Sequence, residues 1–283
     1  MGSVRRVVSA AKRCRTGQNA QTVFARLHAL VARDAPTAVV LRRGPTNKVA
    51  TIGWDLTNDT FTLGQWYRGR IYPYDSDISP DGKHWIYFAL NGKRHEETKG
   101  SYTVLARTPY LKALGLWPVG TTWGGGGGLF SKDGEYWPFS TEPMIEPPDQ
   151  PRADNEFLFG EGWYRGPHHL SRLVRDGWTL VSEPGKESAD YVHNFTRPTF
   201  GEWVMGREVR IRHEVFELRH PSSRQVIALD DWEWADVDVP RERLVWASQG
   251  CMWSGQLVSS GLVNVTLLAD LNDMRFHRTR APY

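Results

Sequence analysis

An internal repeat is the feature that most constrains how this chain can fold. Tryptophan followed three residues later by glycine occurs at residues 66–69, 117–120 and 163–166, at intervals of 51 and 46 residues. The first and third copies are the identical tetrapeptide Trp-Tyr-Arg-Gly, and after every copy an Asp-Gly pair precedes a further tryptophan. Residues 203–206 form a degenerate fourth copy without the Asp-Gly pair. A period of about 40–50 residues is typical of proteins built from repeated supersecondary units.

The segments between these copies predict many short β-strands. Runs of β-branched and aromatic residues alternate with turn dipeptides such as Asp81-Gly82 and Asn91-Gly92, as in antiparallel hairpins. The predicted strands cover residues 38–41, 49–54, 60–63, 84–90, 102–106, 178–182, 209–213, 215–218, 244–247 and 263–269. The first strand of each repeated unit is expected at residues 74–79, 125–130, 168–174 and 232–238.

Repeated units of four short strands predict an all-β fold, a single β-propeller over residues 37–283. Dividing this length by about 45–50 residues per blade predicts five blades, with four or six as alternatives. The thirteen tryptophans are then mainly core between adjacent blades, since each blade buries its faces against its neighbours. Strands 263–269 and 274–278 are expected to help close the ring with strands that follow Pro36.

The N-terminal residues carry a separate, basic character. Residues 1–33 hold seven basic and no acidic residues, while the whole chain has a net charge of only +3, so the remainder is mildly acidic. We predict a flexible basic tail over residues 1–20. A basic tail on an acidic body gives no strong nucleic-acid signal apart from the tail itself. Contact with phosphates and an organelle presequence are alternative interpretations of the tail.

Residues 21–36 predict a short amphipathic helix that packs on the ring. The apolar residues that recur at helical spacing are Val23, Phe24, Leu27, Leu30 and Val31. Asp34 and Pro36 then end the pattern. With this segment assigned to a helix, the first blade begins near Ala38 without an obvious first strand.

One repeated unit resembles a known family. The sequence Asp-Ile-Ser-Pro-Asp-Gly-Lys at residues 77–83, followed by Trp-Ile-Tyr-Phe at residues 85–88, is similar to the repeat of TolB-type (PD40, WD40-like) β-propellers. Residues 131–134 match it in part. The resemblance implies that this turn joins the innermost strand of a blade to the second strand. It implies a propeller fold and no single activity, and the partners of periplasmic members are not carried over because no secretory signal is visible.

Common catalytic motifs are missing from the sequence. There is no His-Glu-x-x-His, Cys-x-x-Cys, Gly-x-Ser-x-Gly or phosphate-loop motif. The glycine run at residues 124–128 is followed by Leu129 rather than Lys-Ser or Lys-Thr, so we expect close backbone packing there. Cys14 and Cys251 are the only cysteines. They suggest a reducing compartment, with Cys251 as a buried and inert thiol.

Connections between blades are expected to place aromatic and basic residues at one channel rim. The predicted ligand-binding residues are Tyr67, Arg68, Tyr72, Trp123, Tyr164, Arg165 and His168. Aromatic faces together with arginine suit a flat polar ligand, a sugar or an anionic group. The alternative is that both Trp-Tyr-Arg-Gly copies are structural, with their arginines bound to carbonyls of neighbouring blades.

Carboxylates and histidines near the channel mouth are the weak catalytic candidates. These residues are Asp75, Asp77, His168, His169, Asp236 and Asp238. Carboxylates near an axis can act as acid and base or bind a cation. Adjacent histidines on a strand point to opposite faces, so they cannot hold one metal together. No cofactor and no metal site are predicted, with an axial cation as the alternative.

We therefore expect a non-catalytic propeller module that binds a protein partner or a small polar ligand at one rim. The alternative is a propeller enzyme, a carbohydrate-active hydrolase or lyase, that uses the carboxylates and histidines of the channel mouth. Two carboxylates about 5–9.5 Å apart across an axial pocket would favour the enzyme. No apolar run reaches the length of a membrane span, and we predict a cytoplasmic location, with organelle targeting through the basic N-terminus as the alternative.

Overall fold

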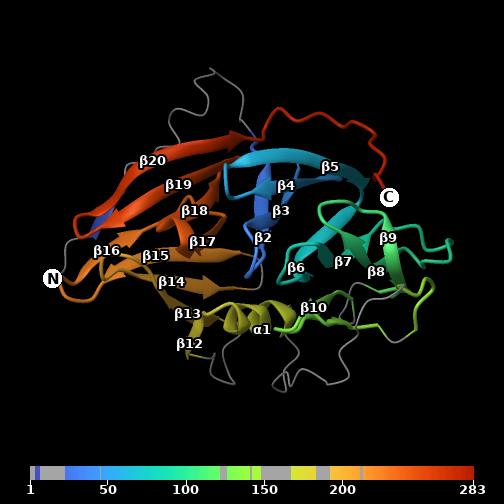
Figure 1. The fold of residues 1–283 in the computed structure, drawn as a ribbon, viewed down its shortest axis with the longest axis horizontal. Coiled ribbons are helices and arrows are strands. Elements are labelled where there is room, and N and C mark those ends of the chain that lie inside the picture. Colours follow the sequence, from blue (N-terminus) through green and yellow to red (C-terminus); the bar gives the residue numbers. More distant parts are fainter. Residues whose placement is uncertain are drawn as a thin grey trace. The chain divides into compact units, whose positions relative to one another are not determined.

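Among the described residues, most strands pair antiparallel with their neighbours in sequence (Figure 1). The computed structural model describes residues 4–6, 23–44, 46–121, 126–140, 142–147, 167–182, 192–210 and 213–283. They belong to two compact units. Unit 1 comprises Met1–Leu27 and Gly177–Met274, and unit 2 comprises His28–Asp176 and Arg275–Tyr283. The single propeller domain over residues 37–283 stays a prediction.

The first two sheets are consecutive four-stranded meanders. The first has the order β2-β3-β4-β5 and the second β6-β7-β8-β9. Their strands are β2 (Arg26–Val31), β3 (Thr37–Arg43), β4 (Lys48–Asp55), β5 (Thr60–Arg68), β6 (Arg70–Ile78), β7 (His84–Leu90), β8 (Ser101–Arg107) and β9 (Ala113–Pro118). The Trp-x-x-Gly segments at residues 66–69 and 117–120 start in the last strand of each sheet, so the sequence repeat and the four-stranded unit coincide here.

The turn that carries the family resemblance joins the first strand of a sheet to the second. Between β6 and β7, the Ser79 amide donates to the His84 carbonyl at 2.8 Å, and the Ser79 hydroxyl donates to Asp81 at 2.7 Å. The two-stranded sheet of β10 (Gly128–Phe130) and β11 (Tyr136–Pro138) repeats this turn, with the Ser131 amide donating to the Glu135 carbonyl at 2.8 Å.

Unit 1 contains two further antiparallel sheets. One has the order β17-β18-β19-β20 and the other β1-β16-β15-β14-β13-β12, in which β1 pairs in parallel with β16. Their strands are β1 (Val4–Arg6), β12 (Thr179–Ser182), β13 (His193–Pro198), β14 (Val204–Val209), β15 (Glu214–His220), β16 (Gln225–Ala228), β17 (Trp234–Asp238), β18 (Arg243–Ser248), β19 (Cys251–Val258) and β20 (Gly261–Asp270). A 3-10 turn, η2 (Val239–Arg241), separates β17 from β18.

The protein is all-β, with four sheets of the kind that form propeller blades and one α-helix, α1 (Pro167–Arg175), in the part that the structure describes. Five blades are not confirmed, because the fifth described sheet has only two strands. No helix in the described ranges is long and apolar enough to span a membrane.

The predicted N-terminal helix is wrong. Residues 26–31 form strand β2, the first strand of the sheet that was expected to lack one. Four successive residues of β2, Leu27 to Leu30, are buried. A strand buried on both faces has no visible alternation, so the chance helical spacing of its apolar residues was misleading.

Three of the predicted strands are also corrected. Residues 168–174 lie in helix α1, which begins at Pro167, a residue well suited to a first helical turn. Of the strand expected at residues 209–213, residues 211–212 lie outside the described residues, and Val209 is the last residue of β14. Residues 274–278 form no strand; the segment Arg275–Tyr283 instead contacts β5, where Gln65 Nε2 donates to the Thr279 carbonyl at 2.9 Å.

The core of unit 2 lies between its two blade-like sheets. One buried cluster combines Val39 and Leu41 of β3 with Ile71 of β6 and Trp85 of β7. Trp85 has no exposed surface, and its indole Nε1 donates to the Tyr110 carbonyl at 2.8 Å. The prediction that tryptophan fills the space between neighbouring sheets is confirmed for this residue.

Cys251 does not carry the free thiol that the sequence predicted. It is buried at the start of β19 and is disulfide-bonded. The other cysteine of the sequence, Cys14, lies outside the described residues. A disulfide is typical of oxidising environments, so the cysteine count no longer supports a reducing compartment.

Candidate functional site

The junction of β5 and β6 holds the first of the predicted binding residues. Lys48 and Arg68 lie directly opposite each other on β4 and β5. The guanidinium carbon of Arg68 and Nζ of Lys48 each lie 5.1 Å from the ring centre of Phe276. Among the described residues, no acidic side chain is within ion-pair distance of Lys48 or Arg68. The two cations thus share one aromatic ring and no carboxylate.

The two predicted binding tyrosines of this junction serve packing. The hydroxyl of Tyr67 lies 2.8 Å from the hydroxyl of Tyr102, and burial together with this hydrogen bond raises the pKa of Tyr67. The ring of Tyr72 stacks on Phe88 with 5.2 Å between ring centres. Arg68 is exposed, so it is the member of the predicted set that faces solvent here.

The remaining predicted binding residues cannot be placed at this junction. Trp123, Tyr164 and Arg165 lie outside the described residues, and of His168 only the backbone, in α1, is described. The alternative that the arginine of each Trp-Tyr-Arg-Gly copy binds a carbonyl of a neighbouring blade can therefore be examined only in the copy at residues 66–69. In that copy, Arg68 donates no hydrogen bond to a carbonyl of any described residue.

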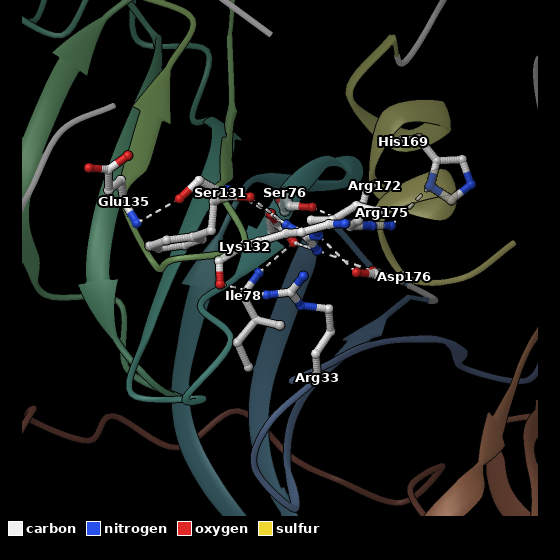
Figure 2. A network of polar contacts seen from close by, with 12 residues as sticks. Arg33, Ser76, Ile78, Ser131, Lys132, Glu135, His169, Arg172, Arg175 and Asp176 are labelled. Carbon is white, nitrogen blue, oxygen red and sulfur yellow. Dashed lines mark hydrogen bonds and ion pairs between the residues drawn. The ribbon is translucent and has the colours of Figure 1, made fainter. Parts of the chain in front are cut away.

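Helix α1 fixes the candidate acid Asp77 in a buried ion pair through Arg175, which is labelled in Figure 2. Arg175 Nη2 donates to Asp77 Oδ1 at 3.0 Å, and Arg175 Nη1 donates to Asp77 Oδ2 and to the Phe130 carbonyl. The fully buried carboxylate also accepts the backbone amides of Ile78 at 2.9 Å and Phe130 at 2.8 Å. Burial alone would lower the pKa of Arg175, but the carboxylates of Asp77 and Asp176 raise it. Asp77 is thus the counter-ion of a permanent cation.

The candidate His169 belongs to the same buried network. Arg172 Nη2 lies 2.9 Å from His169 Nδ1, and Arg172 Nη1 donates to the carbonyls of Pro73 and Ser76. The rings of His169 and Tyr74 are 4.6 Å apart. Figure 2 shows His169, Arg172 and Arg175 on successive turns of α1. Because His169 is helical and buried, its predicted place on a channel strand is wrong.

Asp236 repeats the arrangement of Asp77 in unit 1. It lies opposite Val245 on the first two strands of its sheet, as Asp77 lies opposite Ile86. Its Oδ1 accepts the backbone amide of Val237 at 2.8 Å and pairs with Arg197. The two aspartates differ in burial, since the side chain of Asp236 is 24% exposed and that of Asp77 is 0% exposed.

Asp238 is held by two arginines. Arg241 Nη1 donates to Asp238 Oδ1 at 3.0 Å, and Arg243 Nε donates to Asp238 Oδ2 at 2.8 Å. The side chain of Asp238 is only 2% exposed. Three of the predicted catalytic carboxylates are therefore engaged by arginine.

The described part of the glycine run, residues 126–128, packs closely, as the sequence predicted, and residues 124 and 125 lie outside the described residues. A Cβ at Gly127, whose φ is +94°, would lie 2.1 Å from the carbonyl oxygen of Asp75. At Gly128 it would lie 2.4 Å from the side chain of Ile86. These contacts leave no space for a side chain on the backbone next to β6 and β7. Asp75, the remaining candidate acid, lies on β6 at a bulge in the pairing with β7.

The described ranges hold no group of three or more His, Cys, Asp or Glu side chains placed to bind a metal ion. An axial cation stays a prediction. No protein-family model matches this chain, and no curated protein is significantly similar to it. The functional argument therefore depends on the geometry of the residues themselves.

Sequence reasoning missed two residues of the β5–β6 junction, Lys48 and Phe276. Lys48 is recognisable only once the strand register places it opposite Arg68. Phe276 is more than 200 positions away in sequence and reaches the junction because the segment Arg275–Tyr283 contacts β5. The run of three arginines and a histidine around Phe276 was the available sequence signal.

Proposed function

We propose that this protein is a non-catalytic binding module of the TolB-type propeller class, which binds a partner or small polar ligand at the β5–β6 junction. The observation that carries the proposal is the pairing of Asp77, Asp236 and Asp238 with arginines. Catalytic acid–base groups require accessible atoms and a pKa tuned near the working pH. The carboxylates of Asp77 and Asp238 are 0% and 2% exposed and both are engaged by arginine, so they do not offer the accessible atoms that this chemistry needs.

The repeated position of two of these carboxylates supports the same conclusion. Asp77 and Asp236 bond the next backbone amide and an arginine in the same way. A feature that recurs at the same place in two sheets is expected to stabilise the repeat rather than to perform a reaction at one site. Arg68, in contrast, is exposed and has no acidic partner among the described residues. An exposed arginine beside aromatic rings is suited to binding polar or anionic groups.

The proposal is tested by capture on immobilised protein. We expect wild-type protein to retain specific material from an extract of its source cells, identified by mass spectrometry, and Arg68→Ala to lose it. Lys83→Ala is the matched control, because Lys83 is also an exposed cation of unit 2 but is paired with Asp81 at 3.1 Å. Retention that is equal for the wild type and Arg68→Ala would contradict the site.

The catalytic alternative has its own test. A panel of p-nitrophenyl glycosides and of acidic and neutral polysaccharides is incubated with wild-type protein and with Asp75→Asn. We expect no turnover above the protein-free rate for either protein. Turnover by the wild type that Asp75→Asn abolishes would establish the enzyme and overturn the binding module.

A further inference from the structure

Unit 2 has one strongly basic end. The strand register places residues 42–44, 46–48, 68–70 and 90–101 at the same end of the two sheets, because Lys48 pairs with Arg68, and Arg70 pairs with Leu90. We call this the basic end. It carries eight basic residues, Arg42, Arg43, Lys48, Arg68, Arg70, Lys93, Arg94 and Lys99, against two acidic residues, Glu96 and Glu97.

The opposite end of the same sheets is balanced in charge. Its turns, at residues 32–37, 55–60, 79–84 and 107–113, carry four basic residues, Arg33, Lys83, Arg107 and Lys112, and four acidic residues, Asp34, Asp55, Asp59 and Asp81. Arg33 pairs with Asp34, and Lys83 pairs with Asp81. The charge of unit 2 is therefore unevenly distributed, with an excess of positive charge at one end of its two sheets.

Several cations of the basic end have no carboxylate within ion-pair distance among the described residues. Lys93 pairs with Glu96 at 2.6 Å. For Lys48, Arg68 and Arg94, the described part of the chain supplies no carboxylate within ion-pair distance. Like charges placed directly opposite on neighbouring strands are destabilising, and Lys48 and Arg68 form such a pair. The Phe276 ring attracts both cations but brings no negative charge to the pair. A partner of opposite charge would supply it.

We infer that the basic end is a docking surface for an acidic segment of a protein partner. This inference rests on the proposed function and names its partner class. Charge complementarity selects an anion, and two observations favour carboxylates on a peptide over a nucleic-acid backbone. The exposed Glu97 and the half-buried Glu96 lie among the cations, where they would repel an evenly charged phosphate chain. A peptide can space its acids around them.

The second observation concerns aromatic surface. Single-stranded nucleic acid is bound by free aromatic faces together with positive charge. Here the ring of Phe276 contacts Lys48, Arg68 and the ring of Trp66. The guanidinium carbon of Arg42 lies 5.7 Å from the ring centre of Trp66. Phe276, at 37%, is the one exposed Phe, Tyr or Trp side chain among the described residues, and a single ring does not supply the series of stacking surfaces that successive bases use.

Fluorescence anisotropy with a labelled peptide of ten Glu-Gly repeats, in which the acids are spaced, tests this inference on the full chain. We expect saturable binding that weakens by about tenfold between 50 and 300 mM salt, as exposed charge pairs are screened. The charge-reversed double variant Lys48→Glu/Arg68→Glu should weaken binding by at least about tenfold. The double variant Lys83→Glu/Lys132→Glu, with the same change in net charge in first-to-second-strand turns, should change it less than about twofold.

A second variant guards against a folding defect. Arg94→Glu/Lys99→Glu lies on the β7–β8 hairpin, away from the contacts of Phe276, and is expected to weaken peptide binding by a similar factor. No saturable binding of the Glu-Gly peptide, or equal binding by all variants, would overturn the inference. Tighter binding of a labelled dT10 oligonucleotide that depends on Lys48 and Arg68 would replace the peptide with nucleic acid. If Arg68→Ala loses a neutral or basic partner in the capture experiment, the result supports the proposed binding module and contradicts the inference of an acidic partner.

Discussion

Asp77 is the single residue on which the interpretation of the polar network depends most. It is fully buried, accepts two backbone amides and pairs with Arg175, whose side chain is 10% exposed. Replacing one partner of a buried ion pair leaves the other charge uncompensated. We expect Asp77→Asn to lower the free energy of unfolding by about 3–5 kcal/mol, measured by urea denaturation.

Two matched substitutions are controls for the effect of Asp77→Asn on the free energy of unfolding. Asp81→Asn breaks a pair with Lys83 whose side chains are 52% and 75% exposed, so a loss below about 1 kcal/mol is expected. Asp236→Asn removes the equivalent of Asp77 at a partly exposed site and should fall between the two. A loss for Asp77→Asn no larger than that for Asp81→Asn would show that the buried pair does not stabilise unit 2.

His84 gives unit 2 a pH dependence of a predictable sign. Burial lowers its pKa in the folded protein, Asp81 opposes this effect, and Arg107 and Lys83 add to it. The unfolded chain therefore binds the proton more readily. The stabilisation is complete above the unfolded pKa of about 6.5 and is lost as the pH falls from there through the folded pKa.

The measurement is the thermal midpoint of the wild type and His84→Gln between pH 8 and pH 5. We expect the midpoint of the wild type to fall more over this range than that of the variant, since glutamine does not titrate. Parallel curves for the two proteins would mean that His84 binds protons equally in the folded and unfolded states. The comparison isolates His84, because the other titratable groups are common to both proteins.

At the scale of elements, the glycine run tests whether close packing or ligand binding explains a glycine-rich segment. Gly127 and Gly134 have similar φ angles, +94° and +87°, so alanine at either position carries the same left-handed strain of about 1–2 kcal/mol. The two positions differ in the space available for a Cβ atom. The nearest atom to a Cβ at Gly134 is 4.0 Å away, whereas at Gly127 it is the Asp75 carbonyl oxygen at 2.1 Å.

We therefore expect Gly127→Ala to cost at least about 2 kcal/mol more than Gly134→Ala, because overpacking adds to the strain. Chemical denaturation followed by tryptophan fluorescence measures both losses. Equal losses would mean that β10 moves freely away from β6. In that case the glycine run would be available for a ligand after all.

The same scale shows which elements were predictable. Strands β7 and β8 were predicted almost to the residue because each is bounded by turn dipeptides and read as a short apolar run. Strand β2 was not, because its burial on both faces removes the alternation by which strands are recognised. Helix α1 carried usable signals, with Pro167 at its start and Gly177 at φ +91° after its end. Its apolar residues Leu170, Leu173 and Val174 also recur at helical spacing, but the expected register of the repeat assigned them to a strand.

At the scale of the whole molecule, repeated units were predictable and long-range contacts were not. The Trp-x-x-Gly interval anticipated that four strands follow one another between residues 66 and 117. No local pattern indicates that Arg175 reaches Asp77 or that Phe276 reaches Arg68, because these contacts join residues about 100 and 200 positions apart. Arg68 was predicted as a binding residue from its type, while its charge environment emerged only from the strand register.

The disulfide at Cys251 is the last property of the whole molecule that sequence reasoning missed, and it is directly testable. A disulfide constrains the unfolded chain and is worth about 2–5 kcal/mol in small domains. We expect denatured, unreduced protein to show no reactive thiol, and reduction to release both cysteines of the sequence. Cys251→Ser should lower the denaturation midpoint of unreduced protein to that of reduced wild type. Reactive thiols in the unreduced protein would contradict the disulfide and restore the argument for a reducing compartment.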